Sequence, residues 1–466
     1  MSDPIWRLSA ADLAAAIRNK TLSARQAVDA SLVRIAEVNP LLNALPYVLA
    51  DEARAAADAA DKAVAAGVAL GPLHGVPVAI KVNVDQAGWP TTDGLPSMRD
   101  NIAAVDSPPV ANLRRAGAII IGRSNTPAFS VRWFTDNDLH GRTRNPWNPG
   151  ITPGGSSGGA AAAVASGMCM IGHGNDYGGS VRYPAYACGV VGLRATVGRI
   201  PAFNATARGD RSVTSQMMSV QGPLTRSIAD ARLALHAMAA PDARDPNWVP
   251  APLEPGLPRG PIRVAMFAQS PAHPVDPAVS AAVRQAGAWL AEAGFAVEET
   301  APPDFTEAAA LWRTLVYNDL RRAAVPAINQ FGDAAVRDNI RLILETMPDS
   351  TRDSFLDGLA RRYTLAHKWS LFFETYPILL MPVSWQRPFR IDADTISSAR
   401  SNELVDAQGP MLATALLGLP GLSVPTGLVD GVPMGVQLCA TRFREDLILY
   451  AGAAIEAAAG YLVPDM

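Results

Sequence analysis

Apolar and polar positions follow a helical period in the first part of the chain and a strand-like pattern after it. Within residues 8–66, Ala, Leu and Val recur at helical spacing among Asp, Arg and Glu, which predicts two or three helices. Val76–Val82 is β-branched and mostly apolar, as expected of a buried strand. A helix near Pro108–Ala116 leads into a second apolar strand at Ala118–Ile121. This alternation predicts an α/β fold with helices on both faces of a sheet.

The second half of the chain repeats part of this pattern. Beyond a proline-dense segment at residues 241–261, a second strand–helix–strand unit is predicted at Ile262–Phe267, Pro277–Ala293 and Phe295–Glu299. Residues 300–410 are more helical and carry scattered aromatic side chains. The spacing of these aromatics mostly indicates packing, although helices leaning over a sheet edge would also shape a substrate pocket.

Composition favours one large domain. Of 466 residues, 49% are hydrophobic and 18% are charged, less than the usual charged fraction of about a quarter. This balance predicts a large interior with little surface, rather than several small domains on linkers. Net charge is −3 and no block of Lys or Arg stands out, so a role in nucleic-acid binding finds no support.

Other features bear on cofactors and location. Three widely spaced cysteines without a CxxC pair and six histidines without an HExxH motif predict neither a disulfide framework nor a metal site. The first residues lack a basic start followed by an apolar core, so no signal peptide is expected. The longest apolar stretch, Gly158–Ile171, is too short and too rich in glycine to span a bilayer. We expect a soluble cytoplasmic protein that needs no metal or cofactor and does not bind a membrane.

Two Gly/Ser clusters, at residues 154–159 and 178–180, carry the strongest chemical signal. Glycine lets backbone amides approach a reacting carbonyl closely, and a serine beside such amides is a candidate nucleophile. The GxSxG pattern in the first cluster is weak, because an α/β-hydrolase also needs a late histidine and the last one is His367. The glycines from 172 to 178 only approximate the dinucleotide-binding pattern.

Lys81, at the end of the first predicted strand, is the candidate base. Burial disfavours an ammonium and lowers its pKa, which leaves a neutral amine that can accept a proton. A lysine at a strand end can equally reach solvent, and the local sequence leaves both possibilities open.

Taken together, these segments resemble the amidase signature family, serine hydrolases of carboxamides, over nearly the whole chain. The spacings from residue 81 to 156 and from 156 to 180 also fit that family. The matching segments are Gly75–Lys81, Asn145–Pro149, Gly154–Gly159, Gly174–Arg182 with Pro184–Ala185, Gly222–Pro223 with Arg226 and Asp230, Leu419–Pro425, and Gly431–Gln437.

The resemblance implies a single amidase signature domain over residues 1–466, with a central mixed β-sheet covered by helices on both faces. Its expected parts are N-terminal helices (1–66), a catalytic core (67–240), a proline-rich connector (241–261), a variable helical region that shapes the substrate pocket (262–410), and closing strands with a helix (411–466).

The resemblance also implies a catalytic triad. Ser180 would be the nucleophile, Ser156, in a cis peptide, would relay protons, and Lys81 would be the base. Water would then hydrolyse the acyl-enzyme.

An oxyanion hole and supporting residues follow from the same resemblance. The backbone N–H groups of Tyr177, Gly178 and Gly179, with that of Ser180, would form the hole. Ser157, Asp176 and Arg182 are expected to support the loops or the substrate.

Four positions depart from the family pattern. Tyr177 stands where a small or β-branched residue is common, and Asn175 where Thr or Ser is common. Val82 replaces a frequent Asp, and Arg123 a frequent Lys. None removes a triad atom, but the Tyr177 ring could line or narrow the acyl pocket.

The leading hypothesis is therefore hydrolysis of small, apolar or aromatic carboxamides. One alternative is a glutaminase resembling the glutamine-hydrolysing subunit of glutamyl-tRNA(Gln) amidotransferase, and another is a non-catalytic scaffold on the same fold. The expected partner is a small-molecule amide, with neither nucleic acid nor membrane. A homodimer is the assembly considered, although the sequence does not reveal the oligomeric state.

Overall fold

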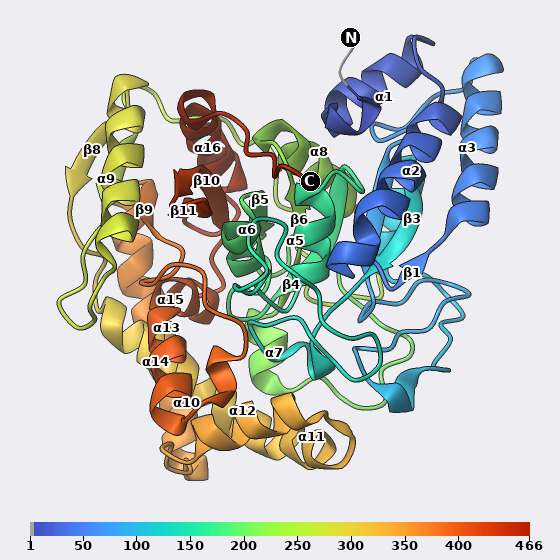
Figure 1. Cartoon of the computed structure of the whole chain (residues 1–466). Helices are drawn as coiled ribbons and strands as arrows, with labels where there is room; N and C mark the ends of the chain where they lie inside the picture. The colour runs from blue at the N-terminus through green and yellow to red at the C-terminus, as the bar shows by residue number, and fades with distance from the viewer. Residues whose placement is uncertain (1–3) are drawn as a thin grey trace.

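The computed structural model describes residues 4–466 as one α/β domain built on an eleven-stranded mixed sheet (Figure 1). The strand order is β1-β3-β2-β4-β6-β5-β10-β11-β9-β7-β8. The strands are β1 Tyr47–Val48, β2 Pro77–Lys81, β3 Ile119–Ser124, β4 Ile171–Asp176, β5 Val191–Arg194, β6 Val220–Thr225, β7 Arg263–Met266, β8 Ala296–Glu299, β9 Ile378–Pro382, β10 Gly421–Val429 and β11 Val432–Ala440.

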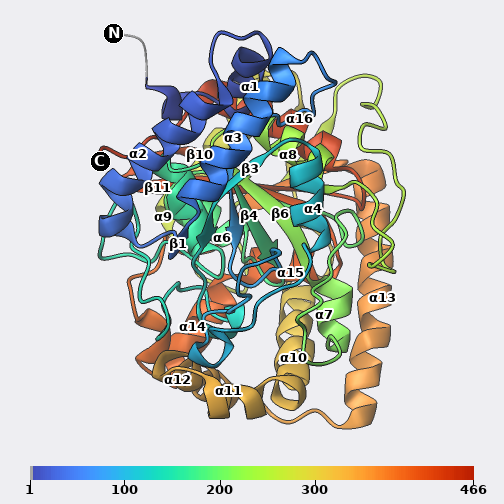
Figure 2. The same ribbon diagram turned by 90° about the vertical axis from the view of Figure 1, so that its right-hand side faces the viewer.

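Sixteen α-helices surround this sheet within the described residues. They are α1 Ala10–Arg18, α2 Ala24–Leu42, α3 Ala50–Ala65, α4 Pro108–Arg115, α5 Gly158–Ala165, α6 Arg182–Cys188, α7 Val213–Met218, α8 Ile228–Met238, α9 Pro277–Glu292, α10 Phe305–Ala323, α11 Val325–Phe331, α12 Ala334–Leu344, α13 Arg352–Thr375, α14 Ser398–Ala407, α15 Gly409–Leu416 and α16 Glu445–Ala459. The region before residue 67 thus holds three helices, α1 to α3, which pack over the β3 side of the sheet (Figure 2).

The sheet combines parallel and antiparallel pairs. β2 lies between β3 and β4 and is parallel to both, with Lys81 opposite Ser124. β4 continues antiparallel into β6. At the other edge, β7 and β8 are parallel and joined through α9, which confirms the strand–helix–strand unit predicted there. Since neighbouring parallel strands end at the same edge of a sheet, the segments that follow β2 and β4 are brought together.

Helices cover both faces of the sheet, as the alternation of strands and helices predicts. Along β10, Leu422 and Val424 meet α16 at Gly452, whereas Gly421 faces Arg182 of α6. Because successive strand residues point to opposite faces, α6 and α16 lie on opposite sides. α5 packs beside α6, and α8 and α9 flank α16. Every residue of α5 is buried, which explains why its sequence is apolar on all sides.

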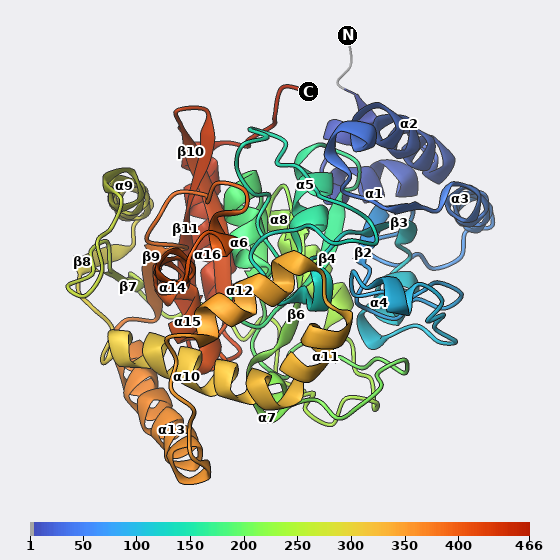
Figure 3. The ribbon, with the colours of Figure 1, turned by 60° about the horizontal axis from the view of Figure 1, so that its bottom comes forward.

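The helices between residues 305 and 416 form a second hydrophobic cluster beside the sheet (Figure 3). Trp312, Trp369 and Trp385 are buried in it, which confirms that much of the aromatic spacing there reflects packing. Tyr363 on α13 and Phe331 on α11 are exceptions, with 78% and 44% of their surfaces exposed. Among residues 4–466, no helix combines the length and the apolar character that a bilayer crossing requires.

Candidate active site

The two Gly/Ser clusters and Lys81 meet at one edge of the sheet. Lys81 is the last residue of β2, and Ser156 and Ser157 directly precede α5. Ser180 lies in the short loop between β4 and α6. The peptide bond between Gly155 and Ser156 is cis.

The Lys81 amine is fully buried, so the alternative in which it reaches solvent is wrong. It donates hydrogen bonds to Ser156 Oγ at 2.7 Å, to Ser157 Oγ at 3.1 Å and to Asn175 Oδ1 at 2.8 Å. All three acceptors are neutral, and no carboxylate of residues 4–466 forms an ion pair with this amine. The buried ammonium therefore lacks a direct counter-ion.

The surroundings of Lys81 favour its neutral form. Burial lowers the pKa of Lys81 from 10.5 to about 7, although the charges of Asp93 and Asp176 act in the opposite direction. The N-terminus of α5 begins directly after Ser156 and Ser157, and a helix N-terminus carries partial positive charge that also disfavours an ammonium. A neutral amine 2.7 Å from the Ser156 hydroxyl can accept a proton from it.

A backbone hydrogen bond holds the Ser180 loop against the loop of Ser156 and Ser157. The N–H of Ser157 donates to the carbonyl oxygen of Ser180 at 3.1 Å, which ties the two clusters together. The side chain of Ser180 is partly exposed, whereas Ser156 is buried. No hydrogen bond joins the Ser180 hydroxyl to any of residues 4–466, and such contacts often tighten only when substrate binds.

Asp176 organises the loop that carries Ser180. Its carboxylate accepts two hydrogen bonds from the Arg182 guanidinium, at 3.0 and 2.9 Å, and one from Arg194 at 3.1 Å. It also accepts the backbone N–H of Gly179 at 2.8 Å. Burial alone would raise the pKa of Asp176, but the two guanidinium groups hold it well below its usual range. All three charged side chains are fully buried.

Among the four amides expected in the oxyanion hole, that of Gly179 is already engaged by Asp176. The N–H groups of Tyr177, Gly178 and Ser180 form no hydrogen bond within residues 4–466. Gly179 has a φ of 108°, a backbone conformation that L side chains rarely adopt. The loop therefore presents three unengaged donors.

Aromatic side chains pack around this loop. The indole N–H of Trp312 donates to the Tyr177 carbonyl at 3.1 Å, and that of Trp133 to the Gly178 carbonyl at 3.1 Å. A Cβ on Gly178 would lie 2.4 Å from the Trp312 ring, so only glycine allows this approach. These contacts engage the carbonyl groups of Tyr177 and Gly178, whose own N–H groups stay unengaged.

The Tyr177 hydroxyl belongs to a hydrogen-bonded group on the other side of its ring from the backbone. The hydroxyl bonds to Thr214, which in turn donates to Asp319 at 2.6 Å. Its ring lies 5.9 Å from that of Trp312 in an edge-on arrangement. Burial raises the pKa of the Tyr177 phenol above its ordinary value, so it is a neutral hydrogen-bonding group at pH 7.

Some residues of the site could not be identified from the sequence. Asn175 stands out there only as a departure from the family pattern, yet its amide contacts Lys81 directly. Asn83 contacts Asn175 in turn, at 3.0 Å. Both asparagines line a cavity of about 460 Å³ that also includes Phe203 and Arg211. A short spacing to Lys81 was the one available signal for Asn83, and nothing in the sequence connects Phe203 or Arg211 to the site.

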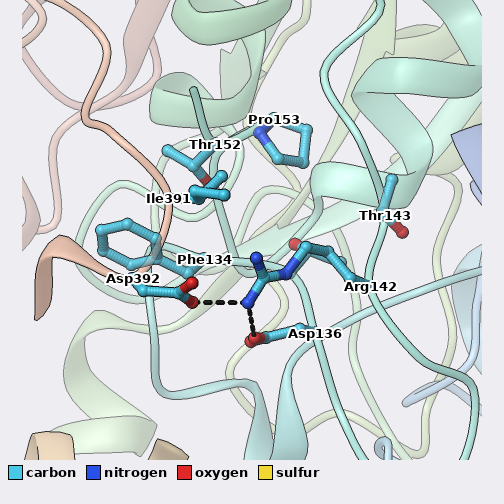
Figure 4. A pocket seen from close by; sticks show the side chains of 9 residues that line it. Phe134, Asp136, Arg142, Thr143, Thr152, Pro153, Ile391 and Asp392 are labelled. Atoms are coloured by element: carbon cyan, nitrogen blue, oxygen red, sulfur yellow. Dashed lines mark hydrogen bonds and ion pairs between the residues drawn. The ribbon is translucent and has the colours of Figure 1, made fainter. Parts of the chain in front are cut away.

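A small surface pocket lies on the segment that leads to the first Gly/Ser cluster (Figure 4). Arg142 bridges Asp136 at 3.2 Å and Asp392 at 2.5 Å, beside Thr152 and Pro153. The pocket has a volume of about 10 Å³, which suits at most a water molecule. We therefore interpret these residues as a structural contact between two segments of the chain. No group of three His, Cys, Asp or Glu side chains within residues 4–466 is arranged to hold a metal ion.

Comparisons with known proteins identify the family of the chain and its fold. The family model described as Amidase matches residues 26–449. An indoleacetamide hydrolase from Bradyrhizobium diazoefficiens is 46% identical, covering 98% of this chain and 88% of that protein. An acylamidase from Rhodococcus erythropolis is 34% identical, covering 97% and 95%. The crystal structure of a bacterial aryl acylamidase of the amidase signature family superimposes with a TM-score of 0.85 at 27% identity, covering 98% and 97%.

Proposed function

The chain belongs to the amidase family and is a hydrolase of amide C–N bonds, and on this premise we propose how it works. Ser180 attacks the amide carbon, and Ser156 passes the Ser180 proton to neutral Lys81. The observation that carries this proposal is the buried 2.7 Å contact between Lys81 Nζ and Ser156 Oγ. This contact supports the proposal because it sets an amine of lowered pKa against the hydroxyl that would relay the proton.

The negative charge that develops on the carbonyl oxygen needs hydrogen-bond donors. We assign the N–H groups of Tyr177, Gly178 and Ser180 to this task, because they are unengaged in the structure. The N–H of Gly179 belongs to the same expected set, and its bond to Asp176 supports a role in holding the loop. Loss of one oxyanion donor typically lowers turnover by about 10²–10³.

The relay then runs in reverse. The proton held by Lys81 returns through Ser156 to the departing nitrogen, since an amide anion is a poor leaving group. The C–N bond breaks and an ester to Ser180 remains. A water molecule gives one proton to the same base and attacks this ester, which releases the acid and restores the Ser180 hydroxyl.

We propose that the substrate is a small carboxamide with an apolar or aromatic acyl group. Trp133, Trp312, Tyr177 and Met411 surround the glycines of the nucleophile loop and support this choice. The resemblance to an indoleacetamide hydrolase and to an acylamidase points to the same class. Indoleacetamide is therefore the first amide to test.

A panel of aliphatic, aryl and amino-acid amides and anilides, scored for ammonia or amine release, tests the proposal. We expect turnover of aryl or arylalkyl amides and an adduct at Ser180 with a serine-reactive phosphonate. Ser180→Ala and Lys81→Ala should be folded but nearly inactive, and Ser156→Ala severely slowed. Near-normal turnover by folded Lys81→Ala would contradict the relay, and preference for glutamine would favour the glutaminase alternative.

The remaining expectations concern location and assembly. A cytoplasmic location stays a proposal, which cell fractionation tests. A homodimer likewise stays a proposal, which light scattering of the purified protein tests. Neither bears on the chemistry assigned to Ser180.

A further inference from the structure

A continuous chain of hydrogen bonds leads from the Lys81 amine to a carboxylate. Lys81 donates to Asn175 Oδ1 at 2.8 Å, and the Asn175 amide donates to Asn83 Oδ1 at 3.0 Å. The Asn83 amide donates to Ser130 Oγ at 3.0 Å. The Ser130 hydroxyl then donates to Asp93 Oδ1 at 2.6 Å. Every bond points the same way, so each strengthens the next between a cation at one end and an anion at the other.

The far end of this chain is held in an unusual backbone conformation. Asp93 has a φ of 47°, and the consecutive residues Phe129 and Ser130 have φ of 58° and 55°. The Phe129 N–H donates to the Asp93 carbonyl at 3.0 Å, which joins the two turns. Non-glycine residues rarely adopt such angles and keep them only where the surrounding structure imposes them. Three of them meet at the Ser130–Asp93 contact.

Asp93 differs from the other carboxylate that acts on Lys81. Asp176 is neutralised by Arg182 and Arg194, whereas no Lys or Arg of residues 4–466 forms an ion pair with Asp93. Burial raises the pKa of Asp93 to about 6, against the effects of the Ser130 hydrogen bond and the Lys81 charge.

The remaining charged and titratable groups near Lys81 do not provide a substitute for Asp93. Arg123 donates to the carbonyl oxygen of Lys81 at 3.4 Å, and His173 is a buried neighbour whose pKa burial lowers to about 3. One group is a cation and the other is neutral at pH 7. Asp93 is thus the carboxylate whose charge is left to balance the amine.

We propose that Asp93 is a positioning residue for the Lys81 amine, acting through Ser130, Asn83 and Asn175. The chain orients the amine toward Ser156 and stabilises the ammonium that forms when the Ser180 proton arrives. The Lys81 ammonium stabilised in this way keeps the proton until the departing nitrogen takes it. This inference rests on the proposed role of Lys81 as the base.

The test is Asp93→Asn, which keeps the size and an acceptor for Ser130 but removes the negative charge. With the aryl amide that the wild type turns over fastest, we expect kcat to fall about tenfold with little change in KM. The acidic limb of the kcat/KM profile should move to lower pH by about half a unit, because Lys81 loses a group that favours its proton. Ser130→Ala, which breaks the chain beside the carboxylate, should shift the limb in the same direction and serves if Asp93→Asn does not fold.

Asp85→Asn is the matched control, because Asp85 is a buried carboxylate of the same segment that bonds Thr91 and Thr206. It should leave the acidic limb in place. An unchanged limb and kcat in Asp93→Asn, or an equal shift in Asp85→Asn, would overturn the inference. These results are read beside Lys81→Ala: if that variant is active, the base assignment itself fails, and if it is inactive, the result for Asp93 stands on its own.

Discussion

Two buried charged groups lie within the same active site, and their surroundings differ sharply. Asp176 is in contact with two guanidinium groups and three backbone N–H groups. Lys81 is in contact with two hydroxyls and an amide oxygen, and the carboxylate of Asp93 is reached only through three intervening side chains. One charge is fully compensated and the other is not.

Under the proposed mechanism, this difference separates a structural group, Asp176, from a proton-transferring group, Lys81. Direct ion pairs keep Asp176 ionised at any physiological pH, so it can hold the nucleophile loop but cannot exchange protons. Neutral partners leave the charged form of Lys81 poorly stabilised, with a pKa of about 7. A group that is balanced between two protonation states can act as a base and then as an acid.

The largest expected effect is on activity. Lys81→Met removes the proposed base while retaining an unbranched apolar side chain, and we expect turnover to fall by about 10³-fold or more. Its melting temperature should stay equal or rise, because the wild type bears the cost of burying a lysine where its charged form is disfavoured. Steady-state kinetics and thermal unfolding check both points. A large fall in melting temperature, equal to the one expected below for Arg182→Met, would contradict the contrast between Lys81 and Asp176.

Arg182→Met should show the opposite behaviour, with a large loss of stability. It leaves the buried Asp176 with one guanidinium, and breaking a buried ion pair costs about 3–5 kcal/mol. Urea unfolding measures this loss. Arg142→Met is the control. The Arg142–Asp392 pair lies at the surface, with 38% of the arginine side chain exposed, so its loss should cost about 1 kcal/mol or less. Equal losses in both variants would contradict the structural role of Asp176.

The pH dependence sharpens the comparison further. The proposed mechanism needs the neutral Lys81 amine, so kcat/KM should fall as the pH drops below about 7. The unfolded chain binds a proton at Lys81 up to about pH 10.5 and the folded chain only to about 7, so this residue makes stability rise between those values. Lys81→Met should lose that rise when unfolding is measured at pH 7 and pH 9. Asp176 should contribute no change across this window.

The smallest effect is expected at Tyr177. Tyr177→Phe removes the hydroxyl that bonds Thr214 and should cost about 1 kcal/mol, without a change in substrate range. Tyr177→Thr also removes the ring beside Trp312 and should alter which acyl groups are accepted. The amide panel measures the difference. If Tyr177→Thr keeps the wild-type preference, the ring has no role in specificity.

Much of the fold follows from local pattern. The β-branched run at Val76–Val82 contains β2, and the apolar run from Ala118 contains the start of β3. Helical spacing correctly predicts α1 to α3 and α9. Such elements are predictable because burial on one face or on all faces imposes its own period. The order of eleven strands in the sheet has no such local signal.

The candidate site also has residues that the sequence predicts and residues that only the fold reveals. Lys81, Ser156 and Ser180 could be named from motif resemblance, and the structure places them at one edge of the sheet. Asn83, Asp93 and Ser130 could not, because they lie in turns whose contacts cross 37–92 positions of sequence. The hydrogen bond from the Gly179 N–H to Asp176 could not be predicted either, because the sequence of a loop does not show which group accepts a given N–H.

Local sequence is sufficient for the layered α/β architecture, for the lysine at the end of a buried strand and for the glycines that let a backbone loop approach a substrate. These features depend on side-chain size, on polarity and on periodicity, which are properties of the chain. Which buried charge has a partner and which has none is settled only by the folded arrangement. A pKa depends on desolvation and on the distance to other charges, and both arise only when distant segments pack together.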